Sequence, residues 1–200
     1  MLKAGLTAFI TMIAILDPLG NVPTFLALSR SLEERLRRRA ASQAVFTALA
    51  IIFGFALIGR LILRYLGVSL ASLSVAGGLL LALVALDMLR GRYDDPEVTE
   101  RANIALVPLG TPLIAGPGAI AATMVLTERN HGFEARAGVW LGIALALGVT
   151  WLVLTLASPI AKRMSASLIH LLSRIVALLL SALAVELVLT GLHAWLRAHP

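Results

Sequence analysis

Six apolar stretches, each long enough to cross a lipid bilayer, dominate this sequence. A helix needs about 20 apolar residues to cross a hydrocarbon core of roughly 30 Å. The segments between the stretches hold nearly all of the charged residues. We therefore expect an all-α, polytopic membrane protein with six transmembrane helices in a single membrane domain, residues 1–200. The stretches lie approximately at residues 3–29, 41–63, 67–89, 103–127, 137–159 and 169–192.

The composition agrees with a membrane protein and limits the chemistry. Hydrophobic residues make up 59% of the chain and charged residues only 14%, with a mean hydropathy of +0.92. A soluble domain is about a quarter charged. Cysteine is absent, which excludes disulfides and thiolate metal sites, and we expect no cofactor. The four histidines are not spaced as metal ligands would be, and they are His131, His170, His193 and His199.

Positive charge is distributed unevenly over the two sides of the predicted bundle. The loops after the first, third and fifth helices hold eleven Lys and Arg residues, and the opposite side, termini included, holds six. The longest charged loop is Arg30 to Arg39, followed by Arg90 to Arg101. Since cytoplasmic loops carry the excess of Lys and Arg, we expect both termini outside. The net charge of +6 is explained in this way, so no nucleic-acid partner is expected.

The sequence resembles itself when it is shifted by 99 residues, which predicts two repeats of approximately 1–99 and 100–200. Each repeat would hold three crossings, an odd number, so the second would enter the membrane in the opposite orientation. This is the inverted repeat of many transporters. A coincidence of similar composition is the alternative. The aligned pairs are Pro18 and Pro117, Thr24 and Thr123, Arg37 and Arg136, Arg64 and Arg163, Ser74 and Ser173, and Asp87 and Glu186.

Proline and glycine interrupt the first and fourth apolar stretches, at residues 17–23 and 108–118. A proline inside a helix removes a backbone donor and clashes with the preceding turn, so we expect both helices to be broken. Asp17 before Pro18 has the chemistry of an N-cap followed by a helix-starting proline, and Gly116 before Pro117 offers an equivalent start without the carboxylate. Such breaks must be buried in protein or face water.

The two breaks are the candidate binding site. Half-helix N-termini present free N–H groups and a positive dipole end, and unwound carbonyls offer oxygen ligands, which suits an ion or a small polar solute. The alternative is that Asp17 and Asn21 only cap the broken backbone. The candidate site residues are Asp17, Pro18, Gly20, Asn21, Thr24, Thr111, Gly116, Pro117, Gly118 and Thr123.

Two acidic residues inside membrane segments are candidates for proton or ion coupling, because an ionisable group in a bilayer is a functional hypothesis by default. Asp87 has Arg90 one turn later, so a helix-end pair at the interface is an equal explanation. Glu186 lies deeper and has no basic neighbour within a turn. A structural, hydrogen-bonded carboxyl is the alternative for Glu186.

Glycines on two other helices are interpreted as packing positions. Gly138 and Gly142 form a Gly-x-x-x-Gly face, and Gly77 with Gly78 would permit close approach of a neighbouring helix. No serine or threonine has a histidine base nearby, and neither a phosphate-binding loop nor a paired-carboxylate motif is present. We therefore do not expect an enzyme.

The two breaks resemble the two motifs of the MarC family of bacterial inner-membrane proteins. The first is Asp17-Pro18-Leu19-Gly20-Asn21-Val22-Pro23-Thr24-Phe25, and the second runs from Pro108 to Ile120. Residues 76–89 also look like the third helix of that family. The resemblance covers nearly the whole chain and implies six helices and an inner-membrane location. By analogy with LysE-type exporters it supports a transporter. One departure is Glu186, where the family is associated with a Gln.

The leading hypothesis is a secondary transporter or exporter of a small polar solute, with the broken helices forming a site near the middle of the bilayer. The rival is a non-transporting structural or stress-related membrane protein whose breaks only shape the fold. A third option, a passive channel, would need a continuous polar pore, and the sequence lacks the rings of repeated charge that would favour one. The expected partners are the lipid bilayer and a small polar solute or ion, and a homo-oligomer is left open.

Overall fold

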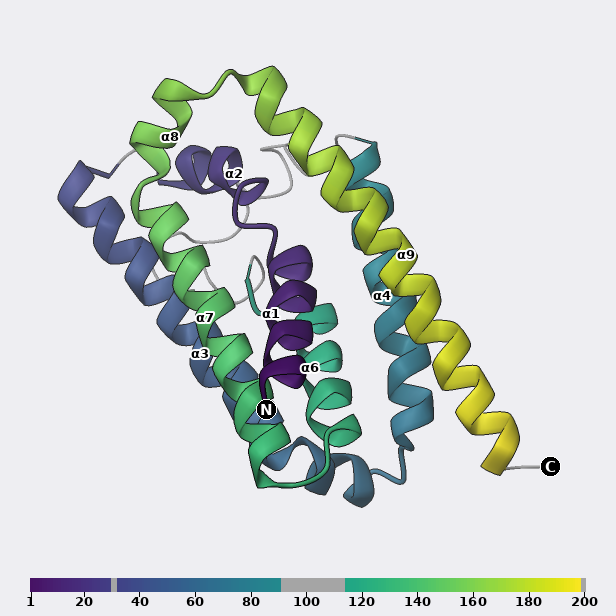
Figure 1. Cartoon of the computed structure of the whole chain (residues 1–200). Coiled ribbons are helices and arrows are strands. Elements are labelled where there is room, and N and C mark those ends of the chain that lie inside the picture. Colours follow the sequence, from purple (N-terminus) through teal and green to yellow (C-terminus); the bar gives the residue numbers. More distant parts are fainter. Residues whose placement is uncertain (30–31, 91–113, 199–200) are drawn as a thin grey trace.

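The computed structural model describes residues 1–29, 32–90 and 114–198, and within them the chain is helical with no strand (Figure 1). Four of the described helices are long and apolar enough to cross a membrane, so the protein is a multi-pass membrane protein. They contain the spans Glu34–Gly59, Leu70–Leu89, Phe133–Thr155 and Ser167–Ala198, while Leu2–Leu16 is a shorter apolar helix. The helices are α1 (Leu2–Leu16), α2 (Asn21–Leu28), α3 (Glu34–Tyr65), α4 (Leu70–Leu89), α6 (Pro117–Arg129), α7 (Phe133–Thr155), α8 (Ala157–Arg163) and α9 (Ala166–Ala198).

The predicted loop over Arg30 to Arg39 is wrong in its second half, because α3 already begins at Glu34. Glu34 lies in the first turn, where its charge suits the positive end of the helix dipole. It also pairs with Arg37 at 3.5 Å and with Arg38 at 3.3 Å, at the helical spacings of three and four residues. The charged residues therefore stabilise a helix start instead of a loop.

The helix ends near residue 160 also differ from the prediction of one stretch over 137–159. The helix α7 ends at Thr155, and the short helix α8 follows it over Ala157–Arg163. The last helix, α9, is longer than predicted and reaches Ala198. Apolar runs alone do not mark these ends, since polar residues at an interface can continue a helix beyond the hydrocarbon.

The described helices pack in two groups that lie side by side in Figure 1, with α9 at the edge of the molecule. In one group α1 packs on α7, and both contact the core shared with α3 and α6. In the other group α4 packs along α9. Most of the large hydrophobic side chains exposed on the described helices are leucines, as expected for a surface that faces lipid.

Close backbone approach at glycines explains both pairings and confirms the interpretation of these glycines as packing positions. A methyl group added at Gly142 would overlap the carbonyl oxygen of Gly5 and lie 3.0 Å from the amide nitrogen of Phe9, so α7 touches the backbone of α1. A methyl group added at Gly78 would lie 2.7 Å from the carbonyl oxygen of Ala184, so α4 touches the backbone of α9.

Candidate binding site

The first helix ends at Leu16 in a tight turn organised by Asp17. Asp17 has a left-handed backbone, with φ 34° and ψ 67°, and its N–H donates to the carbonyl of Ile13. Asp and Asn tolerate this conformation better than most residues do. The Asp17 carboxylate oxygen Oδ1 accepts a hydrogen bond from the Gly20 N–H at 3.2 Å, and the Asp17 carbonyl accepts one from the Asn21 N–H at 3.1 Å.

The predicted role of Asp17 as an N-cap before a helix starting at Pro18 is therefore wrong. Asp17 is the C-terminal cap of α1, and α2 begins three residues after Pro18, at Asn21. The reason is the left-handed backbone at Asp17, which ends α1. Residues 18–20 then form a turn before α2 begins. Pro18 lies within the turn and not in the first turn of a helix.

Asn21 and Thr24 hold buried oxygen atoms with no hydrogen-bond partner among the described residues. Asn21 is 3% exposed, and its side-chain nitrogen donates to the carbonyl of Leu16 at 2.8 Å, which caps α1. Its Oδ1 atom and the Thr24 hydroxyl oxygen are two of six buried side-chain atoms without a hydrogen-bond partner among the described residues, and the other four are Arg37 Nε, Trp140 Nε1 and the hydroxyls of Thr127 and Thr155. Buried polar atoms in folded proteins nearly always have a partner, so this pair of oxygens points to a missing donor or cation.

The absence of a side chain at Gly20 leaves room for the Asp17 carboxylate and for a hydroxyl from the last helix, α9. A methyl group added at Gly20 would overlap the Asp17 carboxylate and lie 2.8 Å from the Ser173 hydroxyl oxygen. Asp17 itself is buried, at 7% exposure. Sequence reasoning did not place Ser173 at the site, and its alignment with Ser74 in the repeat was the only signal for it.

The second break is described only from residue 114 onward, and Thr111 lies outside the described residues. The helix α6 begins at Pro117 with Gly116 as its N-cap, as the sequence predicted for a helix start. The Gly116 carbonyl accepts hydrogen bonds from Ala119 and Ile120. Gly118 lies against α4, where a methyl group would come 3.0 Å from the Cγ atom of Leu81.

Thr123 connects the second break to the first helix. It is fully buried, and its hydroxyl donates to the sulfur of Met12 at 3.7 Å. The helices α1 and α6 run in opposite directions (Figure 1). Asp17 lies five residues after Met12 and Pro117 lies six residues before Thr123, which is about 8 to 9 Å of helix rise in each case. The end of α1 and the start of α6 therefore lie at a similar level.

The two membrane acids are not at this site. Asp87 and Glu186 are both exposed, Asp87 within the last turn of α4 and Glu186 on α9. The Glu186 carboxylate accepts a hydrogen bond from the Thr190 hydroxyl, one turn later on the same helix, at 3.2 Å. A charged side chain at the centre of a bilayer costs roughly 3 kcal/mol or more, so the exposure of Glu186 needs an explanation of its own.

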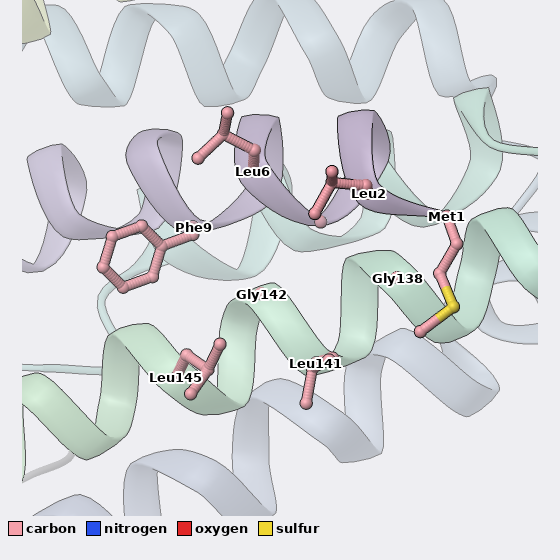
Figure 2. Close-up of a pocket in the computed structure, with 9 residues that line it drawn as sticks. Met1, Leu2, Leu6, Phe9, Gly138, Leu141, Gly142 and Leu145 are labelled. Carbon is pink, nitrogen blue, oxygen red and sulfur yellow. The ribbon is translucent and has the colours of Figure 1, made fainter.

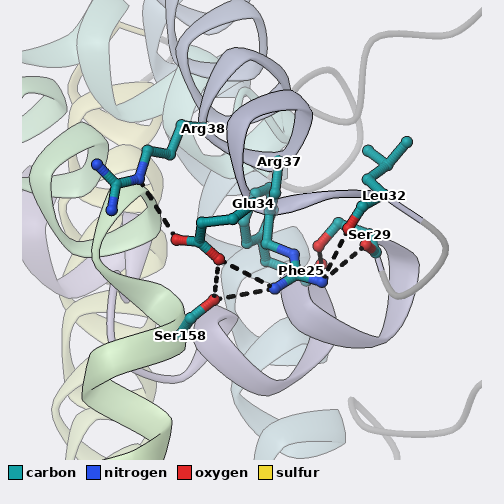
Figure 3. A network of polar contacts seen from close by, with 7 residues as sticks. All are labelled: Phe25, Ser29, Leu32, Glu34, Arg37, Arg38 and Ser158. Atoms are coloured by element: carbon teal, nitrogen blue, oxygen red, sulfur yellow. Dashed lines mark hydrogen bonds and ion pairs between the residues drawn. The ribbon is translucent and has the colours of Figure 1, made fainter.

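An arginine network fixes the other end of α2 (Figure 3). The Arg37 guanidinium donates to the Ser158 hydroxyl at 2.9 Å and to the carbonyls of Ser29 and Leu32 at 3.3 and 3.2 Å. Ser158 in turn donates to Glu34 at 3.0 Å. Residues of α3, α8 and the segment after α2 are joined in this way. The sequence singled out Arg37 only as a repeat match.

Two cavities among the described residues lie away from this turn. A cavity of about 380 Å³ between α1 and α7 is lined only by apolar residues and glycine, as Figure 2 shows, and it suits a hydrocarbon chain. A second cavity, of about 280 Å³, lies beside Arg136 and Trp140 at the start of α7. The described residues contain no group of three or more His, Cys, Asp or Glu side chains placed to hold a metal ion.

The chain is similar along nearly its whole length to a set of membrane proteins. Residues 2–196 match the family described as MarC family integral membrane protein. UPF0056 membrane protein MJ1677 of Methanocaldococcus jannaschii is 39% identical over 199 residues, which cover 96% of this chain and 97% of that relative. UPF0056 membrane protein YvbG of Bacillus subtilis is 31% identical, over 92% of this chain and 92% of that relative. UPF0056 membrane protein YhcE of Escherichia coli is 32% identical, over 92% of this chain and 89% of that relative. No solved structure matches the chain.

Proposed function

This chain belongs to the MarC family of integral membrane proteins, and we propose that it is a secondary transporter or exporter of a small polar solute. The relatives are named only as membrane proteins, so the proposal depends on the site. Its ligand would be bound at the turn between α1 and α2, with α6 beginning at a similar level. We expect no chemical change to the solute.

The observation that carries the proposal is the pair of unpaired, buried oxygens of Asn21 and Thr24 in the first turn of α2. Three features support a polar ligand there. The Asp17 carboxylate is buried one turn earlier, the Ser173 hydroxyl lies close to Gly20, and the end of α1 carries backbone carbonyls. An ion, an ammonium group or a hydroxylated solute can donate to or coordinate such oxygens.

The wider architecture is part of the proposal. We infer that α1 with α2 forms one interrupted membrane segment and that α6 belongs to the equivalent segment of an inverted repeat of three crossings each; residues 103–113 of the second predicted segment lie outside the described residues. Alternating access then comes from movement of one repeat against the other. The antiparallel contact of Thr123 with Met12 and the helix start at Pro117 support this arrangement. The excess of Lys and Arg on one side supports a cytoplasmic-membrane protein with both termini outside.

The test is solute flux through the purified full-length chain in proteoliposomes, with a panel of labelled anionic, cationic, zwitterionic and uncharged small solutes. We expect at least one solute to move faster than in protein-free liposomes. Asp17→Asn keeps the side-chain oxygen that closes the turn and removes the charge, and it should lower that flux by about tenfold, the value of one charge-assisted contact. Asn21→Ala should also lower it.

The matched control is Glu134→Gln, the same change of carboxylate to amide at an exposed position in the first turn of α7. Its flux should equal that of the unchanged protein. The site assignment fails if Asp17→Asn and Asn21→Ala transport every solute at the unchanged rate. If the unchanged protein moves none of the solutes, the proposal of a transporter fails.

The rival function, a non-transporting structural membrane protein, has one observation in its favour. Asn21 caps the carbonyl of Leu16, and Asp17 accepts the Gly20 N–H, so both residues also shape the turn. A non-transporting protein predicts no flux above that of protein-free liposomes for the unchanged chain. A transporter whose turn is purely structural predicts equal flux for the unchanged chain and for Asp17→Asn, which preserves both the acceptor and the backbone preference.

A further inference from the structure

Glu186 lies near the middle of the membrane-embedded part of α9. The antiparallel contacts with α4 set this depth. A methyl group at Gly78 would lie 2.7 Å from the Ala184 carbonyl oxygen, and one at Gly191 would lie 2.8 Å from the Ala71 carbonyl oxygen. This register places the span Leu70–Leu89 beside residues of about 174–192 of α9, given the common rise per residue. Glu186 is then about 5 Å from the midpoint.

The side of α9 that bears Glu186 faces away from α4. Ala177, Leu180, Ala184 and Leu187 are buried in the cluster with α4, whereas Glu186 is exposed. Figure 1 shows α9 at the edge of the molecule. The exposed residues that share this side with Glu186 include Ile175, Leu178, Leu179, Ala182, Val185 and Leu189.

Within the described residues, the carboxyl of Glu186 forms no ion pair, and it accepts a hydrogen bond from the hydroxyl of Thr190 on the same helix. Lipid chains offer neither donor nor acceptor, so the rest of its hydrogen-bonding capacity is unused in a monomer. Polar side chains at this depth draw helices together, because a partner helix supplies the missing hydrogen bonds. We therefore expect Glu186 to form a hydrogen bond with another helix inside the membrane.

We propose that the α9 surface around Glu186 is the interface of a homodimer. A protonated carboxyl is both a donor and an acceptor, so two copies of Glu186 related by a two-fold axis satisfy each other. Self-complementary contact of this kind is the rule in two-fold dimers, the commonest oligomers. Ala182, one turn before Glu186, is small enough for the two helices to approach closely. A second copy thus provides both the polar contact and the apolar packing.

The first test measures dimerisation of the full-length chain in phosphatidylglycerol and phosphatidylethanolamine vesicles by energy transfer between labelled copies. Glu186→Leu should weaken dimerisation by about fivefold or more, whereas Glu186→Gln, which keeps a donor and an acceptor, should dimerise like the unchanged chain. The matched control is Asp87→Leu, an equivalent change near the end of α4, which should have no effect. Equal dimerisation of Glu186→Leu and the unchanged chain, or a monomeric unchanged chain, would overturn the proposal.

The second test uses the absence of cysteine in the chain and does not depend on how well Glu186→Leu folds. Ala182→Cys and Leu189→Cys should each form a disulfide-linked dimer under mild oxidation in the same vesicles. Leu145→Cys, on the exposed side of α7, is the control and should stay monomeric. No cross-link at residues 182 and 189, or an equal yield at residue 145, contradicts the interface. Neither test depends on whether the protein transports a solute.

Discussion

At the scale of single residues, Asp17 connects the shape of the chain to its proposed chemistry. Its backbone turns the chain out of α1, one carboxylate oxygen holds the Gly20 N–H, and the group is buried beside Ser173. A substitution can separate the role of Asp17 in the turn from the role of its charge. Asparagine reproduces the hydrogen-bond acceptor and the backbone preference of Asp17 but not its charge.

We predict that Asp17→Ala lowers the free energy of unfolding by about 2 kcal/mol, from the lost hydrogen bond and the cost of a left-handed alanine. Asp17→Asn should be at least as stable as the unchanged protein. Reversible denaturation in mixed micelles measures both. If the alanine variant proves as stable as the asparagine variant, the account of the turn is wrong.

The sequence predicted which residues form the first break, but not how they are arranged in space. Pro18 and Gly20 indicated an interruption, and an ionisable residue in a membrane segment indicated Asp17. The direction in which Asp17 caps could not be predicted, since an Asp before a Pro is compatible with both a helix start and a helix end. Ser173 could not be predicted either, because its approach to Gly20 depends on how α9 packs.

At the scale of helices, glycines decide which pairs approach to backbone contact. The Gly-x-x-x-Gly spacing on α7 predicted packing, but the sequence did not indicate that α1 is the partner. The helix ends were the least predictable feature. Glu34 and Arg38 extend α3 into a segment whose charge alone suggested a loop.

We predict that Gly142→Ala lowers the free energy of unfolding by about 1 to 3 kcal/mol, since the added methyl group must push α1 away from α7. Gly148→Ala on the same helix is the control. No atom lies within 4 Å of its added methyl group, so the better helix propensity of alanine should keep or raise stability by up to about 1 kcal/mol. Equal losses in the two variants, measured in the same micelles, would exclude close packing as the cause.

At the scale of the whole molecule, the all-α, multi-pass character could be predicted, because bilayer thickness fixes the length of an apolar helix that crosses it. The described residues contain four such spans, and the number of six crossings stays a prediction. The inverted repeat and the orientation in the membrane remain predictions. The start of α1 and the end of α9 lie toward the same end of the molecule in Figure 1.

The predicted orientation places the exposed residues His131, between α6 and α7, and Ala161, on α8, on opposite sides of the membrane. In single-cysteine variants, a membrane-impermeant maleimide should label His131→Cys in intact cells and Ala161→Cys only after permeabilisation. The reverse pattern would invert the orientation. Labelling of both residues from outside would contradict the crossing by α7.

The central claim is that a bound ligand provides the missing interaction partner of the buried oxygens of Asn21 and Thr24. The most direct test is an experimental structure of the full chain in lipid, at a resolution that shows bound ions and solutes. The account predicts a non-protein species within about 3.2 Å of the Asn21 Oδ1 atom or the Thr24 hydroxyl. If protein donors alone occupy both oxygens, the turn between α1 and α2 is a structural feature and not a binding site.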